Sequence, residues 1–384
     1  MIGKCEIKSR FADTDGGSSI KLSTLRVNGF KEVDRLCKCT ERTTDTKTLG
    51  HTGEKILNEC YIDLTLDKLR ELDDDRYAQD RYIMQRSRFL DRGMVNALVI
   101  KLRMPYGSEM EKADYDYLCS LLTWSRNDIF IMPILEFEGT ADRKIMPSRY
   151  NSFTEKMLEL KDSWTANADA AMGVPHYYSR RRIDDLFGIY ERKGEDPRFV
   201  AVDYNNGRMD KPGATAGTII KHFKEGGIDD TFLYAVNVRP YRKAARTAED
   251  IAGISDAWDM YMVNYMFNAV GPTHSRPHSV RVELGWSNMG RLFDESRIKY
   301  LRLNRKDDRA PFCEWIEDRY GIVLDDDPMK NPSVYQYLRR YNFEKTNAAL
   351  AETSEAIRKN DTDEIREFIA KSMPDVVKEP RLGC

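Results

Sequence analysis

Short apolar runs alternate with amphipathic stretches through most of the chain from about residue 95 onward. The β-prone runs of this region are Ala97–Leu102, Ile129–Leu135, Ala170–Val174, Phe199–Val202, Phe232–Val238, Val280–Leu284 and Tyr300–Leu303. Helical spacing of apolar residues follows most of them, at Glu109–Leu122, Phe153–Ala166, Arg182–Arg192, Thr215–Glu225 and Ala248–Phe267. Repeated strand–helix units of about 30 residues or more predict a parallel sheet with helical crossovers.

An α/β barrel explains this alternation best. One further apolar run, Glu59–Leu64, brings the number of candidate strands to eight, as a TIM-like (β/α)8 barrel of about 250 residues requires. The alternative is a doubly wound sheet, which would carry a glycine-rich phosphate turn after its first strand. Neither Gly16-Gly17 nor Gly226-Gly227 stands between a strand and a helix in that pattern. We therefore expect the barrel over residues 66–330.

The two ends of the chain have different patterns. Residues 1–65 are predicted to form a β-rich extension, because Asp13–Gly17 is a strong turn signal between the candidate strands Cys5–Ser9 and Ser19–Val27. Residues 331–384 are predicted to be helical, with one helix over Ser333–Lys359 and a capping box at Asp361 before a second. We expect this helical pair to pack on the barrel, and a surface for oligomerisation is the alternative.

Composition narrows the class of protein. The 384 residues include 61 Lys and Arg against 63 Asp and Glu, with 41% hydrophobic residues. This balance excludes a disordered chain and a globally basic nucleic-acid-binding protein, although a local basic patch is compatible with it. The most apolar run, Ile129–Leu135, is far shorter than the roughly 20 residues of a membrane span, and no signal-peptide pattern occurs. We expect a soluble cytoplasmic protein without membrane partners.

The cysteines suggest one metal site. Seven cysteines, an odd number spread over a long chain, indicate a reducing compartment rather than a disulfide framework. Cys37, Cys39, His51 and Cys60 supply four soft ligands within a short segment, which is enough for a structural zinc ion. The C-x-C spacing is shorter than the usual C-x₂₋₄-C of zinc sites, so scattered thiols are the alternative.

Catalytic candidates come from the positions that follow each strand, where the active sites of α/β barrels lie. These positions hold Arg103, Glu136, Glu138, His176, Asp203, Asn237, Arg239 and Glu283. Asp203 is the preferred catalytic residue, because it ends an apolar strand and precedes a glycine-containing loop. His176 is the second catalytic candidate, since histidine exchanges protons near neutral pH. An Asx turn at Asp203 and a structural role for His176 are the alternatives.

Arginines at the strand ends indicate the class of substrate. A guanidinium group binds phosphate or carboxylate in a bidentate manner, so Arg103 and Arg239 are predicted to bind an anionic substrate together with Glu136 and Asn237. Surface ion pairing is the alternative for these arginines. His274 and His278 have a spacing that would suit a helical metal site, but Gly271-Pro272 and Pro277 predict a loop instead.

The function predicted from these features is acid–base chemistry on a small anionic substrate, of phosphorylated or nucleotide type. The first alternative is an enzyme that modifies or exchanges bases in tRNA or DNA, because arginines and aromatic residues are interspersed in Tyr82–Arg92, His176–Arg182 and Arg239–Arg246. The second alternative is a non-catalytic scaffold. Signatures of Walker-type NTPases, zincin proteases and α/β-hydrolases are absent from the sequence.

Overall fold

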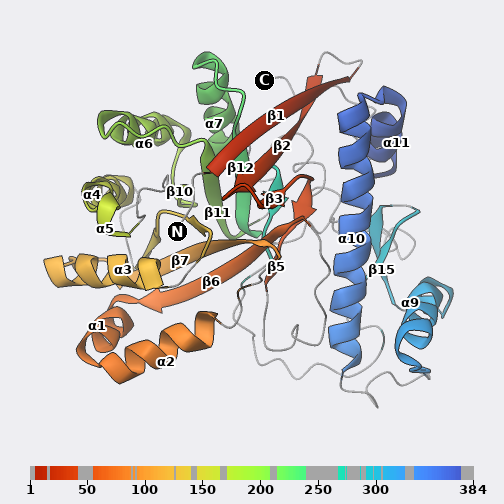
Figure 1. Cartoon of the computed structure of the whole chain (residues 1–384), viewed down its shortest axis with the longest axis horizontal. Helices are drawn as coiled ribbons and strands as arrows, with labels where there is room; N and C mark the ends of the chain where they lie inside the picture. Colours follow the sequence, from red (N-terminus) through yellow and green to blue (C-terminus); the bar gives the residue numbers. More distant parts are fainter. Residues whose placement is uncertain are drawn as a thin grey trace.

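Parallel strands alternate with helices through the central part of the chain (Figure 1). The computed structural model describes residues 5–14, 18–41, 55–87, 90, 93–124, 127–139, 145–164, 171–207, 214–238, 267–272, 274, 286, 291–296, 298–303, 306–324 and 333–372. The α/β class with parallel sheets that the sequence predicts is confirmed. The strand pairings divide these strands between two parallel sheets rather than one closed sheet.

The first parallel sheet contains five strands. In spatial order they are β10 (Met172–Val174), β11 (Phe199–Gly207), β12 (Phe232–Val238), β13 (Ala269–Val270) and β4 (Cys37–Lys38). Every neighbouring pair in this sheet is parallel. The sequence pattern predicts β10, β11 and β12 but not the two-residue strands β13 and β4, which are too short to form an apolar run.

The second parallel sheet is built around a long central strand. Its strands are β5 (Thr40–Glu41), β6 (Leu57–Thr65), β7 (Val95–Pro105), β8 (Ile129–Phe130) and β9 (Ile134–Glu138). Both β8 and β9 pair with β7, and their register differs by one residue across Met132-Pro133. Proline has no N–H to donate to the ladder, which accounts for the interruption at this point.

Two of the predicted barrel strands need separate comment. The run Tyr300–Leu303 was expected to join the parallel strands, but β15 (Lys299–Arg302) instead pairs antiparallel with β14 (Arg291–Asp294). A short connection favours such a local hairpin over a distant parallel partner. The run Val280–Leu284 lies outside the described residues, as does most of the predicted helix Ala248–Phe267.

Helices cover one face of the parallel strands. They are α1 (Leu66–Asp74), α2 (Arg76–Ser87), α3 (Lys112–Trp124), α4 (Met146–Glu159), α5 (Lys161–Trp164), α6 (Arg180–Arg192) and α7 (Ala214–Glu225). Leu98, Ile100 and Leu102 of β7 pack against them in what we call the helix cluster. The alternate residues of β7, Val95, Ala97 and Val99, belong to a second cluster formed mainly by strand residues, the strand cluster.

An antiparallel hairpin at the start of the chain covers the N-terminal ends of the parallel strands. It consists of β1 (Cys5–Thr14) and β2 (Ser18–Val27), with β3 (Lys31–Val33) beside β2, which confirms the predicted hairpin. Leu25 and Val27 join the strand cluster. Lys31 pairs with Asp128 at 2.7 Å, just before β8, and the amide of Ser9 donates to Asp230 at 2.7 Å, just before β12. The hairpin therefore lies at the opposite end of the parallel strands from their carboxyl ends.

The C-terminal region is helical, as predicted. Helix α10 (Val334–Lys359) is long and straight at one side of the molecule, α11 (Thr362–Ser372) follows it, and α9 (Lys306–Tyr320) lies nearby (Figure 1). Asn347 of α10 accepts from the Lys38 amide at 3.0 Å and donates to its carbonyl at 3.1 Å, so α10 is attached to β4. Among the described residues, no helix combines the length and apolarity needed to cross a membrane.

Candidate active site

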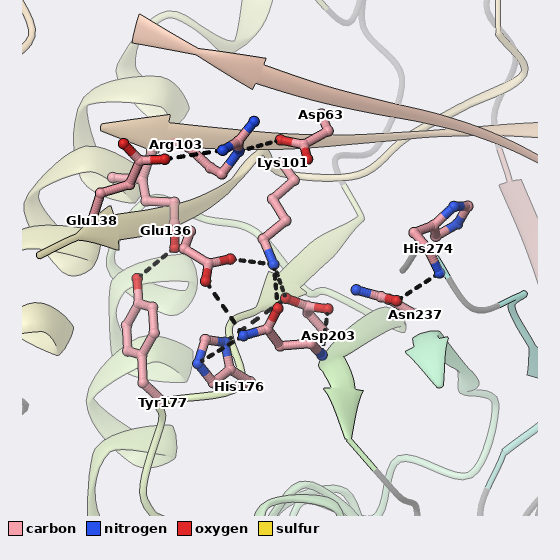
Figure 2. A network of polar contacts seen from close by, with 12 residues as sticks. Asp63, Lys101, Arg103, Glu136, Glu138, His176, Tyr177, Asp203, Asn237 and His274 are labelled. Carbon is pink, nitrogen blue, oxygen red and sulfur yellow. Dashed lines mark hydrogen bonds and ion pairs between the residues drawn. The ribbon is translucent and has the colours of Figure 1, made fainter. Parts of the chain in front are cut away.

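A buried lysine lies in the carboxyl-terminal half of β7 and contacts side chains of β9 and β11. The side chain of Lys101 is only 6% exposed, and its ammonium group forms an ion pair with Glu136 of β9. It also donates to Asn205 Oδ1 at 2.6 Å and lies 3.6 Å from Asp203 Oδ2 on β11 (Figure 2). The alternation of β7 gives this position, because Lys101 follows Val95, Ala97 and Val99 on the same face.

Asp203 is the most buried acid of this group. Asp203 is only 2% exposed, and its Oδ1 accepts a hydrogen bond of 2.8 Å from the Asn205 backbone amide. Its Oδ2 has no hydrogen-bond donor among the described residues and lies 3.9 Å from His176 Nδ1. Burial raises the pKa of the Asp203 carboxyl, and the charge of Lys101 opposes this increase. A carboxyl group with a raised pKa, one of whose oxygens accepts no hydrogen bond from a described residue, is suited to accept and return a proton.

Asn205 connects the acids with His176. Its Nδ2 lies 3.3 Å from Glu136 Oε1 and 3.3 Å from His176 Nε2. Asn205 and Asn206 have φ angles of 46° and 59°, a left-handed conformation that non-glycine residues adopt rarely and asparagine most readily. This turn at the end of β11 places Asn205 Oδ1 within 2.6 Å of Lys101 Nζ. Strained backbone of this kind often occurs at functional sites.

The structure therefore brings together three of the residues predicted from the sequence, namely Asp203, His176 and Glu136. Sequence reasoning missed Lys101, which is the residue that joins Glu136 to Asp203. A signal for it was present, because a lysine inside an apolar run such as ALVIKL is unexpected in a parallel strand that is buried on both faces.

Arg103 has a different environment from the one predicted. Its Nε lies 2.5 Å from Asp63, and its Nη1 lies 2.9 Å from Glu138 (Figure 2). Two carboxylates of the protein thus compensate the guanidinium charge that was predicted to bind substrate. Arg239, its predicted partner, and Glu283 lie outside the described residues.

A second polar group lies near the first, around Glu59 of β6. Its Oε1 lies 2.5 Å from His274 Nε2, and the Tyr234 hydroxyl donates to its Oε2. The His274 ring stacks on Tyr61, with ring centroids 3.7 Å apart and planes 6° from parallel. Asn237 accepts from the His274 amide at 2.9 Å, so it organises this group through the backbone (Figure 2). The sequence pattern gave no role to Glu59, Tyr61 or Tyr234.

The predicted zinc ligands do not assemble among the described residues. Cys37 and Cys39 belong to the strand cluster, whereas Cys60 packs on the helix cluster, because it alternates with the inward-facing Glu59 along β6. Burial raises the pKa of the Cys39 thiol. His51 lies outside the described residues, and the described ones contain no group of three or more His, Cys, Asp or Glu arranged for a metal ion.

Two of the aromatic residues predicted to stack on nucleic acid, Tyr177 and Tyr178, form contacts within the protein. Tyr178 is 3% exposed and donates to the Pro147 carbonyl at 3.0 Å. Tyr177 donates to the Leu135 carbonyl at 2.9 Å, and its ring packs beside that of Phe137. Residues 239–246 lie outside the described part, and 82–92 are described only in part.

Comparison with known proteins identifies no family. No family model matches the chain, and no curated protein matches it. Among solved structures, the chain is similar to the putative copper homeostasis protein CutC from Streptococcus agalactiae. The TM-score is 0.33 at 12% identity, over 62% of this chain and 98% of that chain. The described fold and site define the class only as an α/β protein with parallel sheets and a buried polar centre at the strand ends.

Proposed function

We propose that the two parallel sheets are parts of one eight-stranded barrel. Cys39 alone separates β4 of one sheet from β5 of the other, and its amide donates to the Val270 carbonyl at 2.8 Å. On the opposite side, Ile131 forms a parallel bridge with Ala171 directly before β10. If β4 with β5 and β8 with β9 each count as one strand, the pairings follow chain order around a ring, as in a (β/α)8 barrel. The polar centre would then lie at the mouth where barrel enzymes have their active sites.

We further propose that the protein is an enzyme that performs acid–base chemistry on a small anionic substrate. The observation that carries this proposal is the burial of Lys101 between Glu136 and Asp203. Removing such charges from water costs several kcal/mol for each ion, and well-packed apolar residues are often at least as stable in their place. A carboxyl group whose pKa is raised by burial, as that of Asp203 is, is typical of functional sites.

Each group of the centre has a chemical role in this proposal. Asp203 accepts a proton from the substrate and returns it, because its pKa is raised and Oδ2 lacks a donor among the described residues. His176, whose side chain is 34% exposed, exchanges protons with solvent. Lys101 compensates negative charge on the substrate, which would replace a carboxylate of the protein as the partner of the ammonium group.

Metabolite profiling tests this proposal. The purified protein is incubated with a small-molecule cell extract, and substrate loss and product gain are followed by mass spectrometry. We expect at least one anionic metabolite to be converted by the wild type and by Asp185→Asn, an exposed control on α6. Asp203→Asn should lose this conversion. Equal conversion by Asp203→Asn would refute its catalytic role, and no conversion by the wild type would favour the scaffold alternative.

A further inference from the structure

Tyr61 occupies a central place among the acids of the candidate site. It lies on β6 between Glu59 and Asp63, and strand alternation puts all three on one face. Asp63 is the register partner of Lys101 on the neighbouring strand β7. Four carboxylates from three strands lie close enough to the Tyr61 hydroxyl for their charges to raise its pKa. They are Asp203, Asp63, Glu59 and Glu136. This hydroxyl therefore faces the same space as the acid–base centre.

The Tyr61 hydroxyl is a hydrogen-bond donor that no described residue of the protein accepts from. Among these residues, the contact that Tyr61 does make is the stacking of its ring on that of His274. Burial raises the pKa of the Tyr61 phenol, and the nearby carboxylates, led by Asp203, raise it further. The hydroxyl thus keeps its proton. The two cationic donors of the neighbouring strand β7, Lys101 and Arg103, already bind carboxylates of the protein.

The Tyr61 ring stacks on the imidazole of His274, which is fixed by its own hydrogen bonds. Glu59 accepts from Tyr234 at one oxygen and contacts His274 Nε2 with the other, so the carboxylate acts as an acceptor at both oxygens and the imidazole carries its proton on Nε2. The His274 amide is fixed in turn by Asn237 Oδ1. The imidazole of His274 is therefore tied to Glu59 and its backbone to Asn237, both of which are buried, so the ring face provides a rigid support for Tyr61.

We propose that Tyr61 is a substrate-binding residue whose hydroxyl donates to an oxygen of an anionic group, phosphate or carboxylate, on the substrate. Glu59 and His274 are positioning residues that hold the Tyr61 ring. This inference rests on the proposed function, since it assigns the anion of the substrate to the space between Tyr61 and Lys101. A buried tyrosine among carboxylates binds an oxyanion well only as a neutral donor, because a phenolate would repel it.

Inorganic phosphate is the probe for this inference. The full chain is labelled with 3-fluorotyrosine, and the ¹⁹F resonance of Tyr61 among the 20 tyrosines is assigned from its loss in Tyr61→Phe. We expect phosphate to shift this resonance saturably in the wild type and not in Lys101→Met. Loss of one hydrogen bond in Tyr61→Phe should weaken phosphate binding about tenfold. Tyr335→Phe, an exposed control on α10, should bind as the wild type does.

Two variants of His274 test the positioning role. His274→Gln retains a donor for Glu59 but loses the ring, whereas His274→Phe retains a ring for stacking. We expect His274→Gln to split or broaden the Tyr61 resonance and weaken phosphate binding, and His274→Phe to restore most of the affinity. Equal binding by these two variants would show that the stack does not position Tyr61.

The remaining outcomes are decisive for Tyr61 itself. Phosphate binding that leaves the Tyr61 resonance and the affinity of Tyr61→Phe unchanged would overturn its role, as would the absence of saturable phosphate binding. These binding measurements need no turnover. A failure of the Tyr61 assignment is thereby distinguishable from a failure of the acid–base proposal, which depends on metabolite conversion and Asp203→Asn.

Discussion

The Nζ atom of Lys101 lies 3.6 Å from Oδ2 of Asp203, across the carboxyl ends of β7 and β11. The two strands are not neighbours in one sheet, since β7 belongs to the β5–β9 sheet and β11 to the other. This contact, with the Lys101–Asn205 hydrogen bond of 2.6 Å, therefore joins the two parallel sheets through buried polar side chains. Stability and the candidate chemistry depend on the same few residues.

Lys101→Met should destabilise the protein strongly. The change leaves Asp203 and Glu136 without their cation in a buried place, and breaking such a pair typically costs about 3–5 kcal/mol. We expect this loss in the free energy of unfolding measured with urea at neutral pH. Lys156→Met, which removes an exposed pair with Glu159, should cost less than about 1 kcal/mol. A Lys101→Met loss as small as that of the control would contradict the buried pairing.

The stability difference between Asp203→Asn and the wild type should depend on pH. Because the folded state raises the pKa of the Asp203 carboxyl, it binds the proton more tightly than the unfolded chain, whose carboxyl has a pKa near 3.9. The wild type therefore loses stability relative to the variant as pH rises from about 4 to above the raised pKa. Urea midpoints of both proteins between about pH 4 and 7 measure the trend, and an opposite slope would mean that Lys101 dominates.

The contribution of Lys21 on β2 to the free energy of unfolding should depend on pH. Burial lowers the pKa of its ammonium group from 10.5 to about 8, and the nearby Asp230 and Asp229 oppose this decrease. Between these values the unfolded chain holds the proton that the folded chain releases, so the Lys21 contribution to stability improves as pH rises. Lys21→Met should be more stable than the wild type at pH 7, with a smaller difference at pH 10. The exposed Lys8→Met should show no such trend.

Asn206 offers a test of backbone strain at the end of β11. Its φ is 59°, and its Oδ1 has no hydrogen-bond partner among the described residues, so the asparagine side chain contributes little there. Asn206→Ala should be less stable than Asn206→Gly by about 1–2 kcal/mol, because a left-handed residue with a Cβ carries this penalty and glycine does not. Asn206→Gly should stay close to the wild type in thermal unfolding. Equal losses in both variants would assign the effect to the side chain instead.

The sequence allows much of the fold and part of the site to be predicted. Long apolar runs identify β6, β7, β11 and β12, because burial on both faces leaves a continuous apolar signal. Two-residue strands such as β4 and β13 carry no such signal. Asp203 and His176 could be placed because they follow the predicted apolar runs Phe199–Val202 and Ala170–Val174. Lys101 and Glu59 lie within strands, where only the three-dimensional contacts separate a functional charge from an exposed one.

The contacts of the N-terminal hairpin set an order of events during synthesis. Ser23 on β2 donates to the Thr231 carbonyl, and Ser9 binds Asp230, so the docking partners are separated by 208 and 221 residues. At roughly 5–20 residues per second, the ribosome needs about 10–40 s to supply that distance. For this time the apolar face with Leu25 and Val27 has no native partner in β12. The nascent chain is then most open to chaperone binding or to misassembly with a neighbouring copy.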